Sequence, residues 1–214
     1  TNTPMPWVNV LANPRVGCVV SSTMAGFTFA HNAQQFKLTS WSNDIVRDNA
    51  SEMLLINKQQ FLPATARHSQ GWSAFDAEYD GMKVAVRLFV AVDRMEKYYQ
   101  IRVENTAAEP QHVQLDMVYK LVLGLSEEQT ARYLYSEWDQ ASNSILVRNV
   151  YHPIYRHQVV RLTATEPLTD ISLLRPNRKR LGLTLDIPAG TTRELAFIIA
   201  VDSFEAPAPQ KPNR

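Results

Sequence analysis

The sequence predicts an all-β protein, a large antiparallel sandwich of two sheets. Three observations carry this prediction. Long stretches alternate apolar and polar residues with the period of two that places every second side chain on one face of a strand. Short polar segments separate these stretches, and helical periodicity is scarce. At 214 residues the chain is long enough for one such sandwich with a sizeable core.

The expected strands begin with residues 84–90, where Val84, Val86 and Leu88 alternate with their neighbours. The other expected strands cover residues 99–104, 113–119, 144–150, 158–164, 181–185 and 193–201. Residues 105–110 and 187–190 combine Pro with Asn or Gly, and we expect each to be a turn that joins its two strands as a hairpin or meander. Runs that are apolar on both faces occur beside runs that are apolar on one face, which favours exchange of strands between two sheets.

Helical signals are confined to two short segments. Ser126 precedes Glu127-Glu128-Gln129 and is expected to cap a helical turn, and residues 43–56 are expected to hold another. The last residues, 204–214, carry three prolines and few apolar side chains, which predicts a disordered linker end to which a following domain would attach. We therefore divide the chain into a β-sandwich domain, residues 1–203, and this linker end.

The charge balance excludes several classes of partner. With 22 basic and 21 acidic residues the net charge is +1, so neither nucleic acid nor an acidic membrane is an expected partner. No apolar run approaches the ~20 residues of a membrane span, so no direct membrane insertion is expected, and residues 1–6 do not resemble a secretory signal. The single Cys18 lies in an apolar run and is expected to be a buried free thiol, which fits a reducing compartment.

Two polar blocks, residues 7–17 and 31–44, have a composition that a strand does not need. The second block surrounds Trp41 with amide, hydroxyl and carboxylate side chains. Sugar sites use this mixture, because flat aromatic faces contact the C–H side of a pyranose while planar polar groups bind its hydroxyls. The same residue types also serve ordinary loops. Likewise, Trp41, Trp72 and Trp138 are either binding platforms or partly buried core residues.

Signatures of catalysis are weak. The histidines show no metal-ligand spacing, so neither a metal site nor a cofactor is predicted. Neighbouring carboxylates, the groups that glycoside chemistry requires, occur as Glu78/Asp80, Asp93/Glu96, Glu127/Glu128 and Glu137/Asp139. Charged strand ends explain these pairs equally well. There is no glycine-rich phosphate loop and no nucleophile elbow, and the basic run 175–180 is interpreted as a solvated hairpin loop rather than a phosphate site.

Several segments together resemble a known family. They are residues 3–14 (TPMPWVNVLANP) with Gly17, 26–32 (GFTFAHN), 38–44 (LTSWSND), 71–75 (GWSAF), 88–90 (LFV), 102–105 (RVEN), 121–124 (LVLG) and 149–151 (NVY). This set resembles the N-terminal domain of the cellobiose and chitobiose phosphorylase family, and in particular the phosphorylase-like part of cyclic β-1,2-glucan synthases. The resemblance extends from about Thr3 to Val201. Residues 33–36 depart from the Ser-Arg-Glu-Asn that the family usually has there, Ser40 replaces its usual Pro, and the segment 165–180 is shorter than usual.

The resemblance implies a galactose-mutarotase-like supersandwich that precedes a helical (α/α) barrel. In that family the barrel carries the catalytic aspartate, so this chain would be the non-catalytic, carbohydrate-associated domain that shapes the sugar site and helps dimerisation. The implied partners are a β-glucan or glucose-type sugar, the catalytic helical barrel of the same protein and a second copy in a homodimer. The glucan synthases that it resembles are inner-membrane proteins with this part outside the bilayer, so the implied location is cytoplasmic, as a soluble domain.

Within this implied role, we expect four sugar-contacting residues, Asn32, Trp41, Asn43 and Asp44, and no catalytic residue. Trp7, Asn13 and Arg15 are expected to support them structurally. Two alternatives stay open at this point. One is a free-standing lectin-like module that binds sugar by itself, and the other is a purely structural dimerisation domain.

Overall fold

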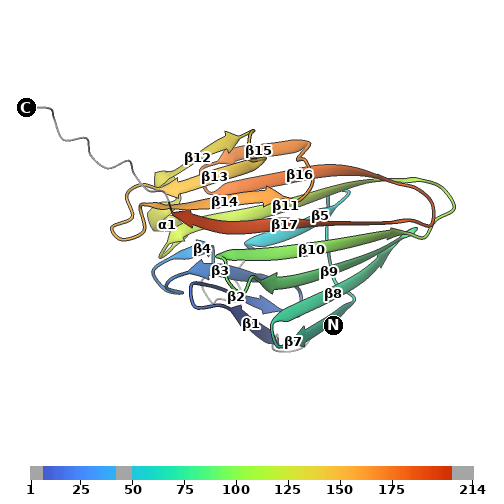
Figure 1. Ribbon diagram of the computed structural model, residues 1–214, viewed down its shortest axis with the longest axis horizontal. Coiled ribbons are helices and arrows are strands. Elements are labelled where there is room, and N and C mark those ends of the chain that lie inside the picture. The colour runs from blue at the N-terminus through green and yellow to red at the C-terminus, as the bar shows by residue number, and fades with distance from the viewer. Residues whose placement is uncertain (1–6, 42–49, 204–214) are drawn as a thin grey trace, which may run out of the picture.

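The computed structural model describes residues 7–41 and 50–203, except for the side chain of Leu174, and shows two large antiparallel sheets packed face to face (Figure 1). The predicted all-β sandwich is confirmed. Every strand pairing among the described residues is antiparallel, from the pairing of β1 with β2 to that of β14 with β17.

The first sheet is built around one long strand, β11 (Gln111–Gly124). Its order is β1-β2-β3-β4-β11-β16-β15, and β5 pairs with β11 and with β6 on a side branch. The other strands are β1 (Val8–Ala12), β2 (Val16–Ser21), β3 (Gly26–Ala30), β4 (Lys37–Thr39), β5 (Glu52–Ile56), β6 (Gln59–Gln60), β15 (Asp170–Arg175) and β16 (Arg178–Ile187).

The second sheet has the order β12-β13-β14-β17-β10-β9-β8-β7. Its strands are β7 (Thr65–Ser69), β8 (Trp72–Tyr79), β9 (Met82–Val90), β10 (Glu96–Asn105), β12 (Leu134–Asp139), β13 (Ser144–Asn149), β14 (Gln158–Ala164) and β17 (Thr192–Ser203). Residues 204–214, the predicted linker end, lie outside the described residues.

Two predicted hairpins prove to be crossovers between the sheets. β10 and β11 belong to different sheets, and so do β16 and β17, although the turns fall where the sequence predicts them. Asn105 joins the two turns: its side chain donates hydrogen bonds to the backbone oxygens of Glu109 and Ile187, both at 2.9 Å. Period-two alternation is the same whether the next strand pairs with the preceding strand or crosses to the other sheet. The sequence pattern therefore does not distinguish a hairpin from a crossover.

The predicted helical turn after Ser126 exists as α1 (Glu127–Thr130), followed by a 3-10 turn, η1 (Ala131–Tyr133). Ser126 occupies the N-cap position, but its side chain makes no capping hydrogen bond. The second helical prediction, residues 43–56, is wrong where it is described. Residues 52–56 form β5, because alternate side chains there face the core beside β11; residues 43–49 lie outside the described residues.

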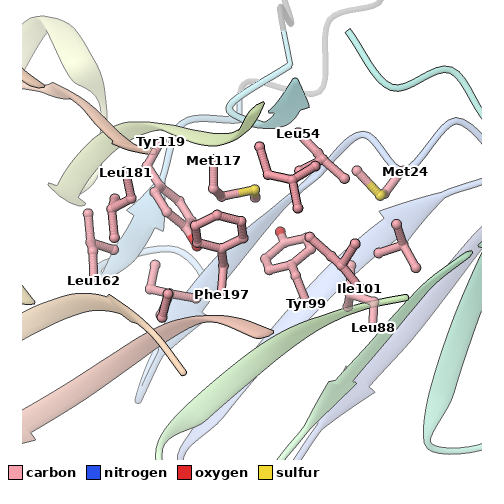
Figure 2. Packing of buried hydrophobic residues seen from close by; sticks show 14 of the residues in the cluster. Met24, Leu54, Leu88, Tyr99, Ile101, Met117, Tyr119, Leu162, Leu181 and Phe197 are labelled. Atoms are coloured by element: carbon pink, nitrogen blue, oxygen red, sulfur yellow. The ribbon is translucent and has the colours of Figure 1, made fainter. Parts of the chain in front are cut away.

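The core fills the space between the two sheets (Figure 2). On β9 the predicted alternation is confirmed, since Val84, Val86 and Leu88 are buried while Lys83 and Arg87 are exposed. Cys18 is a fully buried free thiol, as expected, and burial raises its pKa. The basic run 175–180 lies in the β15–β16 hairpin, where residues 176–177 form the turn and residues 178–180 begin β16. Within it Lys179 is buried rather than solvated, because its strand position faces inward.

No helix in the described ranges is both long and apolar enough to cross a membrane.

We predict that Phe197→Ala lowers the free energy of unfolding by about 3–5 kcal/mol, because it leaves a large cavity between the sheets. Urea unfolding followed by tryptophan fluorescence measures this. Leu62→Ala, at a side chain that is 67% exposed, is the matched control and should cost well under 1 kcal/mol. Equal losses for the two variants would contradict the assigned core.

Candidate functional site

A pocket of about 410 Å³ opens at the end of the sandwich where α1 lies (Figure 1). Three connections form its walls: the β3–β4 loop, the segment from the end of β11 through η1, and the β13–β14 loop. The lining residues are Gln34, Gln35, Gly124, Leu125, Gln129, Thr130, Tyr133, Asn149, Tyr151, His152, Pro153 and Ile154. The pocket therefore joins segments that are more than 100 residues apart in the sequence.

His152 holds two of these walls together. Its Nδ1 accepts hydrogen bonds from the backbone N–H groups of Ile154 (3.2 Å) and Tyr155 (3.0 Å). Because Nδ1 is an acceptor, the ring proton resides on Nε2, which donates to the backbone oxygen of Gln35 at 3.1 Å. Both ring nitrogens are thus used inside the protein, which makes His152 a structural histidine rather than an acid or base for a ligand.

An aromatic cluster supports the same contact between the β3–β4 and β13–β14 loops. Tyr155 stacks on Phe36 with ring centroids 4.5 Å apart and on His31 at 5.3 Å. Phe36 also meets His152 edge-on at 5.5 Å. Such pairs stabilise a contact beyond the area that they bury, so the cluster strengthens the contact between these two loops next to the pocket.

The third wall depends on an unusual backbone at the end of β11. Leu123 has φ = 47°, a left-handed conformation that is rare for a bulky residue. Its carbonyl accepts a hydrogen bond from the Asn149 side chain at 3.0 Å. At Gly124 an added Cβ would lie 2.7 Å from the Thr130 side chain, so only glycine lets α1 pack this closely.

The open surface of the pocket combines aromatic faces with unused amides. Tyr151 is 73% exposed and Tyr133 is 37% exposed, and their ring centroids are 5.1 Å apart. The side-chain amides of Gln34, Gln35 and Gln129 make no hydrogen bond within the described part of the chain. The pocket therefore offers flat apolar faces beside free donors and acceptors.

None of the described residues that line the pocket is an aspartate or a glutamate. Two of the carboxylates paired in the sequence bind cations elsewhere: Glu127 binds Lys120 at 2.5 Å, and Glu137 binds Arg148 at 2.9 Å. Within the described ranges no three His, Cys, Asp or Glu residues are grouped to hold a metal ion. The described lining thus has groups for binding but not the paired carboxylates of glycoside hydrolysis.

The predicted sugar-contacting residues fall in different places. Asn32 lies in the β3–β4 loop beside the pocket, and its Oδ1 accepts the backbone N–H groups of Gln34 and Gln35. Trp41 does not line the pocket; it is half-buried and stacks on Phe27 at 4.4 Å. Asn43 and Asp44 lie outside the described residues.

The predicted supporting residues lie along the edge where β1 and β2 approach the second sheet. Asn13 donates to the backbone oxygens of Ala91 (2.7 Å) and Arg94 (2.8 Å), and Arg15 donates to the backbone oxygen of Asp93 at 2.6 Å. Both residues thereby tie the β2 side of the first sheet to the β9–β10 turn. Trp7 is 74% exposed at the start of β1, and its backbone oxygen accepts a hydrogen bond from Ser22.

The structure also contains a buried ion pair between the sheets, which no pattern in the sequence predicts. Glu52 on β5 and Lys97 on β10 are both 1% exposed at the side chain and lie 2.5 Å apart. Oε1 of Glu52 accepts hydrogen bonds from the hydroxyls of Thr28 (2.5 Å) and Thr39 (2.7 Å), and Tyr99 donates to Oε2. We call these five residues the Glu52–Lys97 network.

The carboxylate of this network is ionised because its partners outweigh its burial. Burial alone would raise the pKa of Glu52, but the charge of Lys97 and hydrogen bonds from Lys97, Thr28 and Tyr99 bring the pKa below its ordinary value. Glu52 and Lys97 are each only 1% exposed at the side chain, so the network is part of the buried interior of the sandwich.

The comparisons with known proteins agree with this architecture. The family model described as "Glycosyl hydrolase 94, supersandwich domain" matches residues 1–177. The chain is 27% identical over 164 residues to the cyclic β-(1,2)-glucan synthase NdvB of Rhizobium meliloti, covering 70% of this chain and 6% of that protein. It is 20% identical over 169 residues to the N,N′-diacetylchitobiose phosphorylase of Vibrio furnissii, covering 70% and 21%.

Solved structures share the fold at low identity. A putative aldose 1-epimerase from Escherichia coli K12 superposes with a TM-score of 0.60 at 9% identity and covers 94% of this chain and 100% of its own. A putative kojibiose phosphorylase from the human microbiome gives a TM-score of 0.52 at 10% identity, covering 90% and 29%. These structures show that the fold is a galactose-mutarotase-like sandwich. Among proteins with this fold, the chain belongs to the glycosyl hydrolase 94 supersandwich family, which confirms the resemblance seen in its sequence.

We predict that Glu52→Gln and Lys97→Met each lower the free energy of unfolding by about 3–5 kcal/mol, because each leaves an unpaired buried charge. The double variant should lose less than either single variant, since neither charge remains. Urea unfolding of the four proteins measures this double-mutant cycle. Additive losses would mean that the two charges do not stabilise each other.

We also predict a specific acid sensitivity. Because the pKa of Glu52 is lower in the folded chain, the unfolded chain binds more protons below about pH 4.3. The stabilisation is present above this pH and is lost as the pH falls through the depressed pKa. Glu52→Gln should therefore flatten the dependence of unfolding free energy on pH between about pH 5 and 3. Glu78→Gln, at an exposed position, should leave that dependence unchanged.

Proposed function

We propose that this chain is a non-catalytic, carbohydrate-associated domain of a glycoside phosphorylase or cyclic glucan synthase. The observation that carries the proposal is the family match over residues 1–177, combined with a pocket whose described lining holds no carboxylate. The chain spans only 6% and 21% of the lengths of the two curated relatives. In this proposal the bond-breaking chemistry resides in a separate part of the native protein.

The proposed partners follow from the same family. They are a β-glucan or glucose-type sugar, a catalytic helical barrel in the same protein, and a second copy of this domain. The rigid sandwich supports such a role, because its charged interior groups are sealed and its polar, aromatic loops gather at one end. A cytoplasmic location and direct sugar contacts by Asn32, Trp41, Asn43 and Asp44 belong to the proposal as well.

The catalytic half of the proposal is tested with the purified chain, inorganic phosphate and either cellobiose or N,N′-diacetylchitobiose. We expect no sugar phosphate, because the described residues that line the pocket include no carboxylic acid that could protonate a glycosidic oxygen. The chitobiose phosphorylase of Vibrio furnissii serves as the positive control. Sugar phosphate that accumulates in proportion to the concentration of the chain would overturn the proposal.

The domain half is tested by the length of the native polypeptide that contains these residues. Mass spectrometry of that polypeptide from its source should find a longer product with additional helical sequence. A native product limited to these 214 residues would favour the free-standing lectin-like module instead.

A further inference from the structure

We infer that the pocket beside α1 is a binding site for a neutral glycosyl unit, with Tyr151 as its stacking platform. This inference deepens the proposed function and rests on it. To the sugar contacts already proposed for Asn32, Trp41, Asn43 and Asp44 it adds a pocket built by three loops, which the sequence pattern does not indicate.

The shape and the aromatic surface of the pocket fit such a ligand. Its volume of about 410 Å³ falls within the range of small-molecule sites, roughly 300–1,000 Å³. Tyr151 exposes 73% of its surface, and its ring is inclined by 49° to that of Tyr133. An exposed tyrosine offers an apolar face and a polar hydroxyl, which match the C–H face and the hydroxyls of a pyranose.

The polar groups of the pocket are of the kind that form hydrogen bonds with sugar hydroxyls. The unused amides of Gln34, Gln35 and Gln129 each provide donors and an acceptor. The described lining contains no Asp, Glu, Lys or Arg, and the nearby cations are engaged, since Lys37 donates to the backbone oxygen of Leu125 and Arg132 lies over the ring of Tyr133. A neutral polyhydroxylated ligand therefore suits the pocket better than a sugar phosphate.

The walls are organised before a ligand arrives. His152 uses both ring nitrogens to join the β3–β4 and β13–β14 loops, and the strained backbone of Leu123 presents its carbonyl to Asn149. Strain of this kind in a bulky residue costs about 1–3 kcal/mol and is concentrated at ligand sites. A preformed site loses less conformational entropy on binding than a site whose loops become ordered only with the ligand.

Leu125 and Ile154 also expose apolar surface at this end, 46% and 61% respectively, which a protein partner would cover. The free glutamine amides and the concave shape distinguish the pocket from a flat apolar contact, so we commit to the sugar. Contact with protein alone is an outcome of the test below.

The test is binding of cellobiose and of β-1,2-linked glucobiose to the purified chain, measured by titration calorimetry and by saturation-transfer NMR. We expect weak binding, with a Kd on the order of 1 mM, as for a shallow open site. Tyr151→Ala should weaken binding at least about tenfold. Tyr135→Ala, at another exposed tyrosine that does not line the pocket, should leave it unchanged, and circular dichroism should show that both variants fold.

The outcomes separate this inference from the proposed function. If the chain binds sugar and Trp41→Ala abolishes binding while Tyr151→Ala does not, the pocket assignment is wrong although the accessory role stands. If no sugar binds at concentrations up to about 50 mM, some fifty times the Kd expected above, the inference is overturned, and loss of self-association in Tyr151→Ala would then mark a protein contact. Tighter binding of glucose 1-phosphate than of either disaccharide would also overturn it, because the ligand would be anionic.

Discussion

The pairing of Glu52 with Lys97 is the interaction on which the rest of the sandwich depends. Each sheet contributes one charge to the dry space between them, and a buried charge is costly unless it is paired and hydrogen-bonded. A slip of one residue in β5 or β10 would turn its charged side chain toward the opposite face. We therefore infer that the network specifies how the two sheets stack, while the surrounding apolar core supplies most of the stabilisation.

A sealed interior leaves the loops as the place for ligand chemistry. The crossover turns around Asn105 join the sheets at one end of the molecule, and the three loops around His152 gather at the other (Figure 1). A rigid scaffold that carries polar and aromatic loops is a common basis for binding sites. Such a scaffold can shape a sugar site next to a catalytic part without supplying an acid or a base.

Much of the fold could be predicted from local pattern, and much of the candidate site could not. The alternation around Val86 identifies β9, because a strand buried on one face needs an apolar side chain at every second position, and this pattern is visible in the local sequence. The role of His152 has no such signal, since the backbone oxygen that accepts the hydrogen bond from its Nε2 belongs to Gln35, 117 residues away. Trp41 and Asn32 stand close together in the sequence, yet only the loop of Asn32 reaches the pocket, because β4 carries the chain away from it.

The sequence by itself determined the all-β class, the buried thiol of Cys18, the turn positions and the family, because these depend on local periodicity and on contiguous motifs. Only the tertiary structure decided which strands pair, since alternation does not record a strand's neighbour. It also decided that Glu52, Lys97 and Lys179 are buried, because long-range packing rather than residue type settles whether a charged side chain leaves water. The pocket belongs with these features, because its walls meet only once both sheets have formed.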